Sequence, residues 1–415
     1  MSTLTASRER ATLTILALVQ FAHVMDFMVM MPLGPQLMRA FAIGPEAFSS
    51  LVASYGLSAG VFGIGATFVL DRFDRKWSLL VLFAGFALAT LMCASAQSYH
   101  VLLLARILAG AFGGVTGSVV TAVVGDVVPR ERRGAGMAFV MSAFSLAQIV
   151  GVPVGLWLAA RSDWHAPFLG LAGVSILVGV AALYILPRVD AHLKDPNPLP
   201  AVGRFVAIVT EVNHLRSFAL VVTLTMSGMI VVPFLATALV RNGGVAEESL
   251  SLVYLCAGIA TLVCNNVIGH FGDRVGHVRM FDLNAVFAII PVILVTNIGE
   301  WTLPLILTVT TLFIISMGAR WTPSMALVTM SVENRLRGGF MSLNTALQSV
   351  AGAVASWLAG VIVVEGADGS ILRFAWVGVA SLACLGVATI IVRRIKIVDA
   401  SATPRPPAPE SGVAD

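Results

Sequence analysis

The sequence predicts an all-α membrane protein in which twelve transmembrane helices form two pseudo-symmetric six-helix bundles, and three observations predict this fold class. First, 58% of the 415 residues are hydrophobic, 12% are charged and the mean hydropathy is +0.91, whereas soluble domains are roughly 45–50% apolar and about 25% charged. Second, charge-free runs long enough to cross a bilayer, about 20 residues each, recur along the chain. Third, two charged motifs repeat about 200 residues apart. This composition excludes a soluble enzyme, a disordered chain and a nucleic-acid-binding protein.

The helix positions follow from the charge-free runs and the polar breaks between them. The run 77–105 is too long for one span, and the polar patch at 95–100 divides it. The first run is too long for the apolar core of a signal peptide and contains Asp26, so it is interpreted as the first span. The helices are expected near residues 12–37, 47–70, 77–96, 101–125, 134–159, 166–187, 217–240, 249–271, 278–298, 302–330, 337–362 and 372–392.

Lys and Arg are distributed unevenly between the two ends of these helices. With both termini placed in the cytoplasm, 20 of the 26 basic residues fall on the cytoplasmic side and four on the outer side. The remaining two, Arg106 and Arg320, lie inside spans. Cytoplasmic loops of membrane proteins carry an excess of Lys and Arg. We therefore expect a multi-pass protein of the inner (plasma) membrane with both termini in the cytoplasm.

Polar segments divide the chain into parts. The longest polar connection separates six helices from six, and its segment 202–215 is mildly amphipathic, which fits either a helix on the inner membrane face or a solvated linker. The expected parts are a cytoplasmic N-terminus at 1–11, bundles at 12–187 and 217–393, a cytoplasmic linker at 188–216 and a disordered cytoplasmic tail at 394–415.

The two halves share charged motifs at corresponding positions. The segment Asp71–Lys76 follows the second expected helix, and Asp273–Arg279 follows the eighth. Arg133 opens the fifth helix as Arg337 opens the eleventh. Parallel halves of this kind are the architecture of large secondary transporters, whose substrate site lies between the halves near the bilayer midplane.

These motifs resemble those of the major facilitator superfamily, and the resemblance covers about residues 10–395. Arg106–Gly110 is similar to the family's R-x-x-Q-G motif on helix 4, with Ala109 in place of Gln. The family's loop signature after helix 2 is similar to two segments of this chain, one with Asp71, Arg72, Arg75 and Lys76 and one with Gly269, Asp273 and Arg274.

A glycine-proline motif on helix 5 extends the resemblance. Gly151, Pro153 and Gly155 look like the motif of the twelve-span drug:proton antiporters, a branch hard to separate from arabinose-efflux-permease-like exporters. The resemblance to this branch implies export. The proline also allows a bend, and the glycines allow close approach of other helices.

Three charges lie deep in the expected spans, namely Asp26, Arg106 and Arg320. Each costs roughly 2.5–3.5 kcal/mol at a helix centre on a translocon-based scale, so each should pair, face water or change protonation. Asp26 and Arg106 lie at compatible depths in helices 1 and 4. Burial disfavours the charged carboxylate, whereas a guanidinium favours it. We expect an Asp26–Arg106 pair in which Asp26 binds and releases a proton during transport; the alternative is a static ion pair that locks two helices.

Further candidate residues lie near these charges. His23 shares an arc of helix 1 with Asp26 and Gln20, and it is a candidate proton relay or substrate ligand, with simple packing as the alternative. Arg320 is expected to attract an anionic or zwitterionic substrate, to hydrogen-bond to polar groups on helix 11 or to reach Asp26 across the cavity. The candidate cavity residues are Gln20, Met30, Arg320, Trp321, Asn344 and Gln348.

The inner loops carry a second candidate feature. Asp71, Arg72, Asp126 and Arg133 are expected to form a charge lattice that holds the outward-open state and breaks when the halves rock. The alternative is a solvated loop that is basic only because it is cytoplasmic.

The predicted function is therefore transport and not enzymatic catalysis. The sequence contains no P-loop, hydrolytic triad or metal cluster, and the four cysteines lie in apolar runs, so no metal or cofactor is expected. We expect a proton-coupled secondary transporter that exports small amphipathic molecules by alternating access. The alternatives are a proton symporter for nutrient uptake and a non-transporting membrane sensor. The expected partners are the lipid bilayer, a small-molecule substrate and protons, with no nucleic acid, and the chain is expected to be a monomer.

Overall fold

The structure is a computed structural model that describes residues 6–129, 132–189, 193, 201–333 and 336–398. Within these residues, twelve helical units are long and apolar enough to cross a membrane, which confirms the all-α twelve-span fold. The first six spans contain α1 (Ala6–Val29), α2 (Gly34–Ala40), α3 (Pro45–Val69), the 3₁₀ turn η1 (Leu70–Arg72), α4 (Arg75–Ala94), α5 (Tyr99–Val127), α6 (Arg133–Leu146), the π-helical turn η2 (Ala147–Gly151), α7 (Val152–Arg161) and α8 (His165–Ile185). After them come α10 (Ala201–Thr210), α11 (Val212–Met229), α12 (Val232–Arg241), α13 (Glu247–Val275), α14 (His277–Thr296), α15 (Leu303–Met330), α16 (Arg337–Ile362), β1 (Val364–Glu365), β2 (Ile371–Leu372) and α17 (Phe374–Val392).

The first and seventh spans each contain two helices where the sequence predicts one. The chain turns between α1 and α2 and again between α11 and α12. Pro35 and Pro233 stand in the first turn of the second helix of each span. A proline there is tolerated at a helix start but disrupts a helix that continues through it. The continuous helix predicted over 12–37 is therefore wrong beyond Val29.

The fifth span is also irregular, as its proline predicts. Between α6 and α7 the helix widens into the π-helical turn η2. Pro153 lacks the N–H that would bond to the carbonyl of Ile149 in an α-helix. The wider turn accommodates this missing bond.

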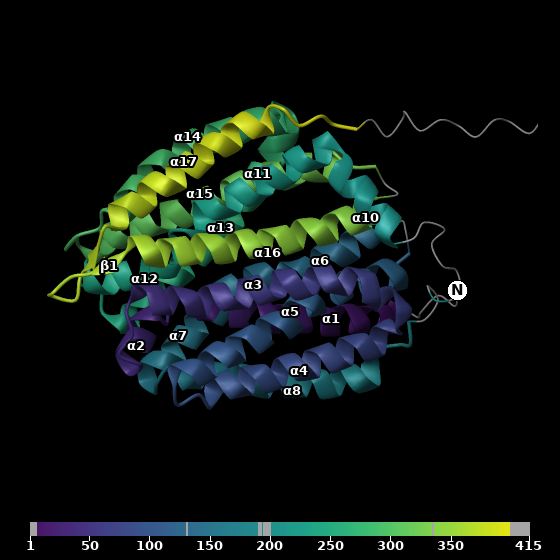
Figure 1. The fold of residues 1–415 in the computed structure, drawn as a ribbon, viewed down its shortest axis with the longest axis horizontal. Coiled ribbons are helices and arrows are strands. Elements are labelled where there is room, and N and C mark those ends of the chain that lie inside the picture. Colours follow the sequence, from purple (N-terminus) through teal and green to yellow (C-terminus); the bar gives the residue numbers. More distant parts are fainter. Residues whose placement is uncertain (1–5, 130–131, 190–192, 194–200, 334–335, 399–415) are drawn as a thin grey trace, which may run out of the picture.

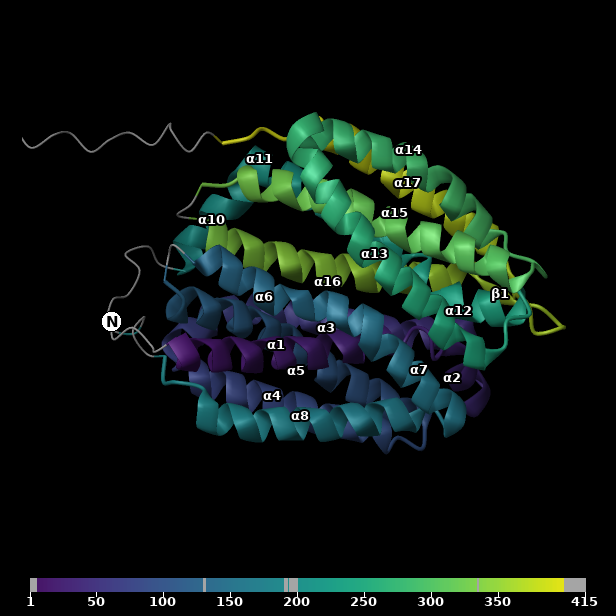
Figure 2. The same ribbon diagram turned by 180° about the vertical axis from the view of Figure 1, so that it is seen from behind.

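The two groups of six spans pack against each other along a long seam. Helices α1 to α8 form one half and α11 to α17 the other, and α3 and α16 lie side by side along the seam in both views (Figures 1 and 2). On the other side of the seam, η2 and α7 contact α13. A Cβ added at Gly258 of α13 would lie 3.1 Å from the carbonyl oxygen of Gln148 in η2. The two halves therefore touch backbone against backbone at this point.

Within the described residues, one of the three buried apolar clusters contains buried residues of both halves. Phe48 and Leu51 of α3 pack in one cluster with Phe234 and Leu235 of α12. The helix α12 lies at the end of the bundle opposite the N-terminus (Figure 1). The rings of Phe48 and Phe234 meet edge to face with centroids 5.8 Å apart. The buried residues of the other two described clusters each come from a single half. The predicted outer end of the bundle is therefore closed.

Polar contacts cross the seam at this closed end. Arg39 of α2 pairs with Glu247 of α13 at 2.5 Å. A Cβ added at Gly34 would lie 2.8 Å from Thr237 Oγ1 on α12. The short helices that follow the two breaks thus contact each other, α2 from one half and α12 from the other.

The connections outside the spans are partly ordered. The amphipathic segment of the expected linker contains the helix α10, whose Phe205 ring lies 5.7 Å from that of Phe68. α11 begins at Val212, earlier than the predicted start at residue 217. Near the closed end, β1 and β2 form an antiparallel hairpin. Glu365 of β1 pairs with Arg241 at the end of α12 at 2.6 Å, which joins the hairpin to this helix. Most of the predicted tail, residues 399–415, lies outside the described residues.

Candidate proton and substrate site

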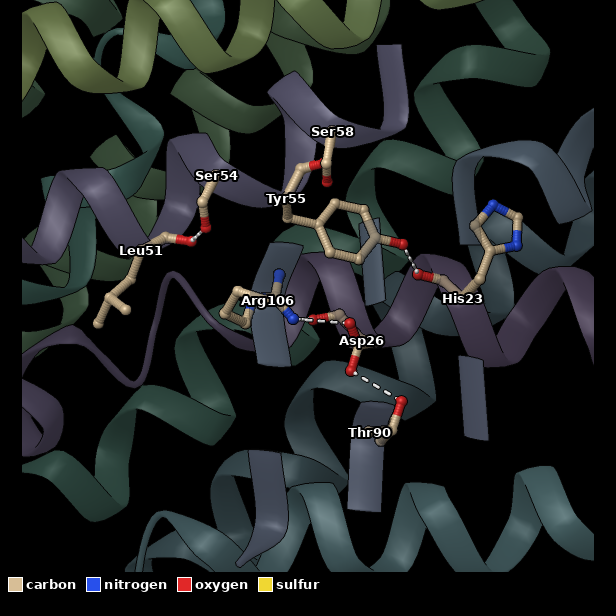
Figure 3. Close-up of polar contacts among 8 residues, drawn as sticks. All are labelled: His23, Asp26, Leu51, Ser54, Tyr55, Ser58, Thr90 and Arg106. Atoms are coloured by element: carbon tan, nitrogen blue, oxygen red, sulfur yellow. Dashed lines mark hydrogen bonds and ion pairs between the residues drawn. The ribbon is translucent and has the colours of Figure 1, made fainter. Parts of the chain in front are cut away.

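The two deep charges of the first half are in contact. Arg106 Nη1 on α5 donates to Asp26 Oδ2 on α1 at 2.6 Å and to the Asp26 main-chain oxygen at 3.3 Å (Figure 3). Both side chains have 0% exposure. The two residues, which the sequence places at similar depths, therefore form an ion pair that joins α1 and α5, the first and fourth spans, inside the bundle.

Neighbouring helices complete the surroundings of this pair. Thr90 Oγ1 on α4 donates to Asp26 Oδ1 over 3.4 Å, and Arg106 Cζ lies 4.5 Å from the centroid of the Tyr55 ring on α3 (Figure 3). The Tyr55 hydroxyl donates to the main-chain oxygen of His23 at 3.3 Å. Four helices thus supply the pair and its immediate neighbours.

The close approach of Tyr55 depends on a glycine. A Cβ added at Gly113 of α5 would lie 2.6 Å from the Tyr55 hydroxyl oxygen, which is closer than real Cβ contacts. The glycines of α5 therefore let α3 approach closely enough for its aromatic ring to cover Arg106.

The hydrogen bonding of Arg106 is incomplete. Its Nε and Nη2 atoms are buried and have no hydrogen-bond partner among the described residues. A buried donor without a partner costs about 1–3 kcal/mol, and more in a charged group. The Asp26 carboxylate and the Tyr55 ring are therefore the main groups that stabilise this cation.

The other candidates on helix 1 do not contact the carboxylate. The imidazole of His23 is directed away from Asp26 (Figure 3), and its buried Nδ1 atom has no hydrogen-bond partner in the described part of the chain. Gln20 is 4% exposed, and its Oε1 atom also has no partner. A Cβ added at Gly117 of α5 would lie 3.4 Å from the His23 ring. Both side chains thus face α5, one and two turns from Asp26.

The deep arginine of the second half has different partners. Arg320 is 1% exposed; its Nε atom donates to the Ser316 oxygen at 2.9 Å and its Nη1 atom donates to Ser227 Oγ on α11 at 3.2 Å. Among the described residues, Arg320 has no hydrogen bond to α16, the eleventh expected helix, and no contact with Asp26, which pairs with Arg106.

The remaining cavity candidates differ in burial and in the cluster that they contact. Met30 is fully buried in the shared core of the closed end. Trp321 packs against the core of the second half, Asn344 is 1% exposed with an unpartnered Oδ1 atom, and Gln348 is half-buried. Met30 and Trp321 thus belong to the surroundings of two different apolar clusters.

Two of the inner charges of the predicted loop and lattice set are in contact in the structure. Asp126 at the end of α5 pairs with Arg75 Nε at 2.5 Å, and Lys76 Nζ donates to the Leu183 oxygen at 2.8 Å. Both contacts lie within the first half. The expected partners Arg72 and Arg133 are exposed, as is Arg274 of the second loop copy. The side chains of Asp71 and Asp273 lie outside the described part, and Gly269 belongs to α13.

The helix 5 motif packs against helix 1. A Cβ added at Gly151 would lie 3.0 Å from Met25 Sδ, and one at Gly155 would lie 2.9 Å from Val29 Cγ2. Pro153 is buried at the start of α7. The motif thus touches the residues that flank Asp26, and its π-helical turn touches α13 across the seam.

Sequence reasoning missed Tyr55 and Thr90. Both are polar residues inside apolar spans, but neither carries a charge, so the search for deep charges passed over them. The small-residue run Gly110–Gly117 was a signal, because it indicates where another helix approaches α5.

The protein has two six-helix halves with twelve apolar spans, and a buried ion pair joins α1 and α5. This combination is typical of membrane transporters. The model of the Major Facilitator Superfamily matches residues 16–230 and 217–414. The chain belongs to this superfamily of transporters, and it is not an enzyme.

Individual relatives are distant. YdhP, an inner membrane transport protein of Escherichia coli (strain K12), is 27% identical over 251 residues, which is 59% of this chain and 62% of YdhP. A putative multidrug resistance protein of Yersinia enterocolitica, MdtD, is 28% identical over 45% of this chain and 39% of MdtD. The matches thus span less than two thirds of these relatives.

Solved structures share the fold. The inward-facing, unoccupied crystal structure of a bacterial homologue of the human lysosomal transporter Spinster has a TM-score of 0.76 at 14% identity, over 94% of this chain and 98% of that one. A D-xylose–proton symporter has a TM-score of 0.75 at 14% identity, over 93% and 97%.

Proposed function

We propose that this chain is a proton-coupled secondary transporter that exports small amphipathic molecules across the inner membrane by alternating access. It works as a monomer with both termini in the cytoplasm and needs no cofactor. The name of MdtD supports export, and that of YdhP supports the inner membrane. The closed predicted outer end then corresponds to the cytoplasm-facing state.

The observation that carries the proposal is the buried Asp26–Arg106 pair. Arginine stays protonated in proteins, so Asp26 is the partner that exchanges a proton. The carboxylate is favoured while the guanidinium lies 2.6 Å away, and it is disfavoured by full burial. A change in either the contact or the access of water therefore changes the proton occupancy of Asp26.

The position of the pair suggests how the cycle changes that balance. Asp26 and Arg106 belong to one half, so rocking of rigid halves does not by itself separate them. Tyr55, however, lies on α3, which follows the seam against α16, and its ring covers Arg106. Movement along the seam is thereby transmitted to the guanidinium.

The energy of one proton is sufficient for export. One charge moved through about 100 mV is worth roughly 2.3 kcal/mol, and a tenfold gradient costs about 1.4 kcal/mol. By the same two principles, one proton entering for each neutral solute supports roughly fortyfold accumulation before any pH gradient is added.

The test is transport by the purified full chain in proteoliposomes of known orientation, screened over a panel of amphipathic compounds. We expect an imposed proton gradient to drive solute against its concentration, and Asp26→Asn to abolish this while facilitated exchange persists. Asp163→Asn, at an exposed carboxylate of the outer side, is the matched control. Uphill transport by Asp26→Asn would contradict the proposal.

The direction of net transport separates export from its rival. A proton symporter for nutrient uptake uses the same fold and the same buried carboxylate. In inside-out vesicles with an acidic lumen, an exporter concentrates solute in the lumen as protons leave it. A symporter instead moves solute out of the lumen together with the protons.

A further inference from the structure

The second half contains a buried cation that the proton site does not use. Arg320 lies inside α15, well away from either end of that helix, and is 1% exposed. Its two bonds are to the Ser316 main-chain oxygen and to Ser227 Oγ. Both acceptors are neutral, so these bonds leave its charge unbalanced.

The first half shows what a balanced arrangement looks like. There Arg106 of α5, the fourth span, pairs with the carboxylate of Asp26 of α1, the first span. In the second half Arg320 of α15, the tenth span, bonds to the hydroxyl of Ser227 of α11, in the seventh span. Within the described part of the chain, no carboxylate lies at ion-pair distance from Arg320. The corresponding helices of the two halves thus differ. In the first half α1 and α5 supply an anion and a cation, whereas in the second half α11 and α15 supply a cation and a neutral hydroxyl.

Apart from the Ser316 main-chain oxygen, the polar groups named around Arg320 are hydroxyls, which can donate hydrogen bonds as the guanidinium does. A guanidinium has five N–H donors in a planar fork that matches a carboxylate. Here the structure uses one donor on Nε and one on Nη1. The Ser227 hydroxyl lies 3.4 Å from that of Ser381 on α17, and hydroxyl hydrogens rotate to suit an acceptor. This chemistry suits an anion with oxygen acceptors.

We propose that Arg320 and Ser227 bind the carboxylate of the transported molecule, so that the substrates are amphipathic organic acids. This inference rests on the proposed transport function and names its substrate class. If the carboxylate leaves the cell while one proton enters, two elementary charges cross the membrane in each cycle instead of one. The membrane potential then drives the cycle twice as strongly as it drives export of a neutral solute.

Equilibrium binding tests the assignment without requiring transport. The probes are matched pairs of ω-phenyl carboxylic acids and their amides, such as 4-phenylbutyrate and 4-phenylbutanamide, with the full chain in lipid nanodiscs. A hydrogen bond to a charged group contributes about 1.5–3 kcal/mol, so we expect the acid to bind about tenfold or more tightly than the amide. Equal affinities, or no binding of any acid of the series, would overturn the assignment.

Variants locate the preference. In Arg320→Gln the acid should lose its advantage while the amide still binds, and amide binding reports that the variant is folded. Ser227→Ala, which keeps the guanidinium, should lose part of the advantage and serves if Arg320→Gln does not fold. The proposal is overturned if the acid preference survives in Arg320→Gln. If Arg320→Gln is unfolded, an unchanged preference in Ser227→Ala overturns it instead. Displacement of the acid by equimolar chloride also overturns it.

A separate variant distinguishes this inference from the proton coupling. Asp26→Asn should keep the full acid preference in the binding assay, because Asp26 pairs with Arg106 in the other half. Loss of the preference in Asp26→Asn would place the acid at the proton site and overturn the Arg320 assignment. Failure of proton-driven transport with an intact acid preference would instead contradict the proposed function alone.

Discussion

The ring of Tyr55 covers the guanidinium of Arg106, with Cζ 4.5 Å from the ring centroid, while the Tyr55 hydroxyl donates to the main-chain oxygen of His23 (Figure 3). One side chain of α3 therefore contacts both helices that the ion pair joins, α5 through Arg106 and α1 through His23. Because α3 also follows the seam between the halves, Tyr55 is the residue best placed to relate movement of the halves to the ion pair.

Replacing Tyr55 should separate the contribution of its ring from that of its hydroxyl. A desolvated cation–π contact is worth about 2 kcal/mol, so Tyr55→Leu should lower proton-driven transport by roughly tenfold or more. Tyr55→Phe keeps the ring and loses only the 3.3 Å bond to His23, so its activity should stay within a few-fold of wild type. Transport rates in proteoliposomes check both variants.

Binding of a non-transported ligand, or the unfolding midpoint in detergent, provides the control for folding. If Tyr55→Leu and Tyr55→Phe lose activity equally, the hydroxyl and not the cation–π contact is the important group. If neither loses activity, Tyr55 has only a packing role.

The Arg39–Glu247 pair should bias the bundle toward the conformation with a closed predicted outer end. The hydrogen bond to Glu247 raises the pKa of Arg39, so Arg39 remains charged throughout the physiological pH range. The Arg39 side chain is 57% exposed, and exposed pairs contribute about 0.2–1 kcal/mol. Arg39→Gln should therefore shift the closed population by up to about fivefold.

Distances between spin labels at the exposed positions Glu46 and Glu248, measured by pulsed electron spin resonance, report this population. Arg39→Lys should retain most of the bias. High salt should weaken the pair in the wild type and leave Arg39→Gln unaffected. A distance distribution that is identical in wild type and Arg39→Gln would show that the apolar core alone closes this end.

The sequence predicted the spans and the central ion pair because both depend on the cost of charge in lipid. Charge-free runs mark what the bilayer tolerates, and Asp26 and Arg106 were recognisable as charges that need each other. The breaks after Val29 and Met229 were not predicted, although Pro35 and Pro233 mark the start of the next helix in each case. The contact between α2 and α12 joins residues far apart in the sequence and could not be read from it.

The pairing of uncharged and surface groups was harder to predict for the same reason. Asp126 had several basic residues within reach, and a choice between Arg75 and Arg133 requires the relative rotation of α4, α5 and α6. Met30 was expected in the cavity but lies in the closed-end core, because the break after α1 changes which way the following residues face.

Gly60 should be required for the close approach of α3 and α16. A Cβ at this position would lie 2.9 Å from the main-chain oxygen of Ala346 and would also collide with the side chain of Val350. Because a backbone atom cannot move aside as a rotamer does, Gly60→Ala must push the helices apart, and overpacking of this kind typically costs about 1–3 kcal/mol. We expect a lower unfolding midpoint in detergent and slower transport.

Gly65 provides a matched control on the same helix. No atom lies within 4 Å of a Cβ added there, so Gly65→Ala should be neutral or should stabilise the helix by about 0.5–1 kcal/mol. The difference between the two alanine variants removes the general effect of glycine on helix stability and leaves the cost of contact at the seam. If Gly60→Ala is as stable and as active as Gly65→Ala, α3 and α16 can accommodate a methyl group at the seam, and their close approach is not required.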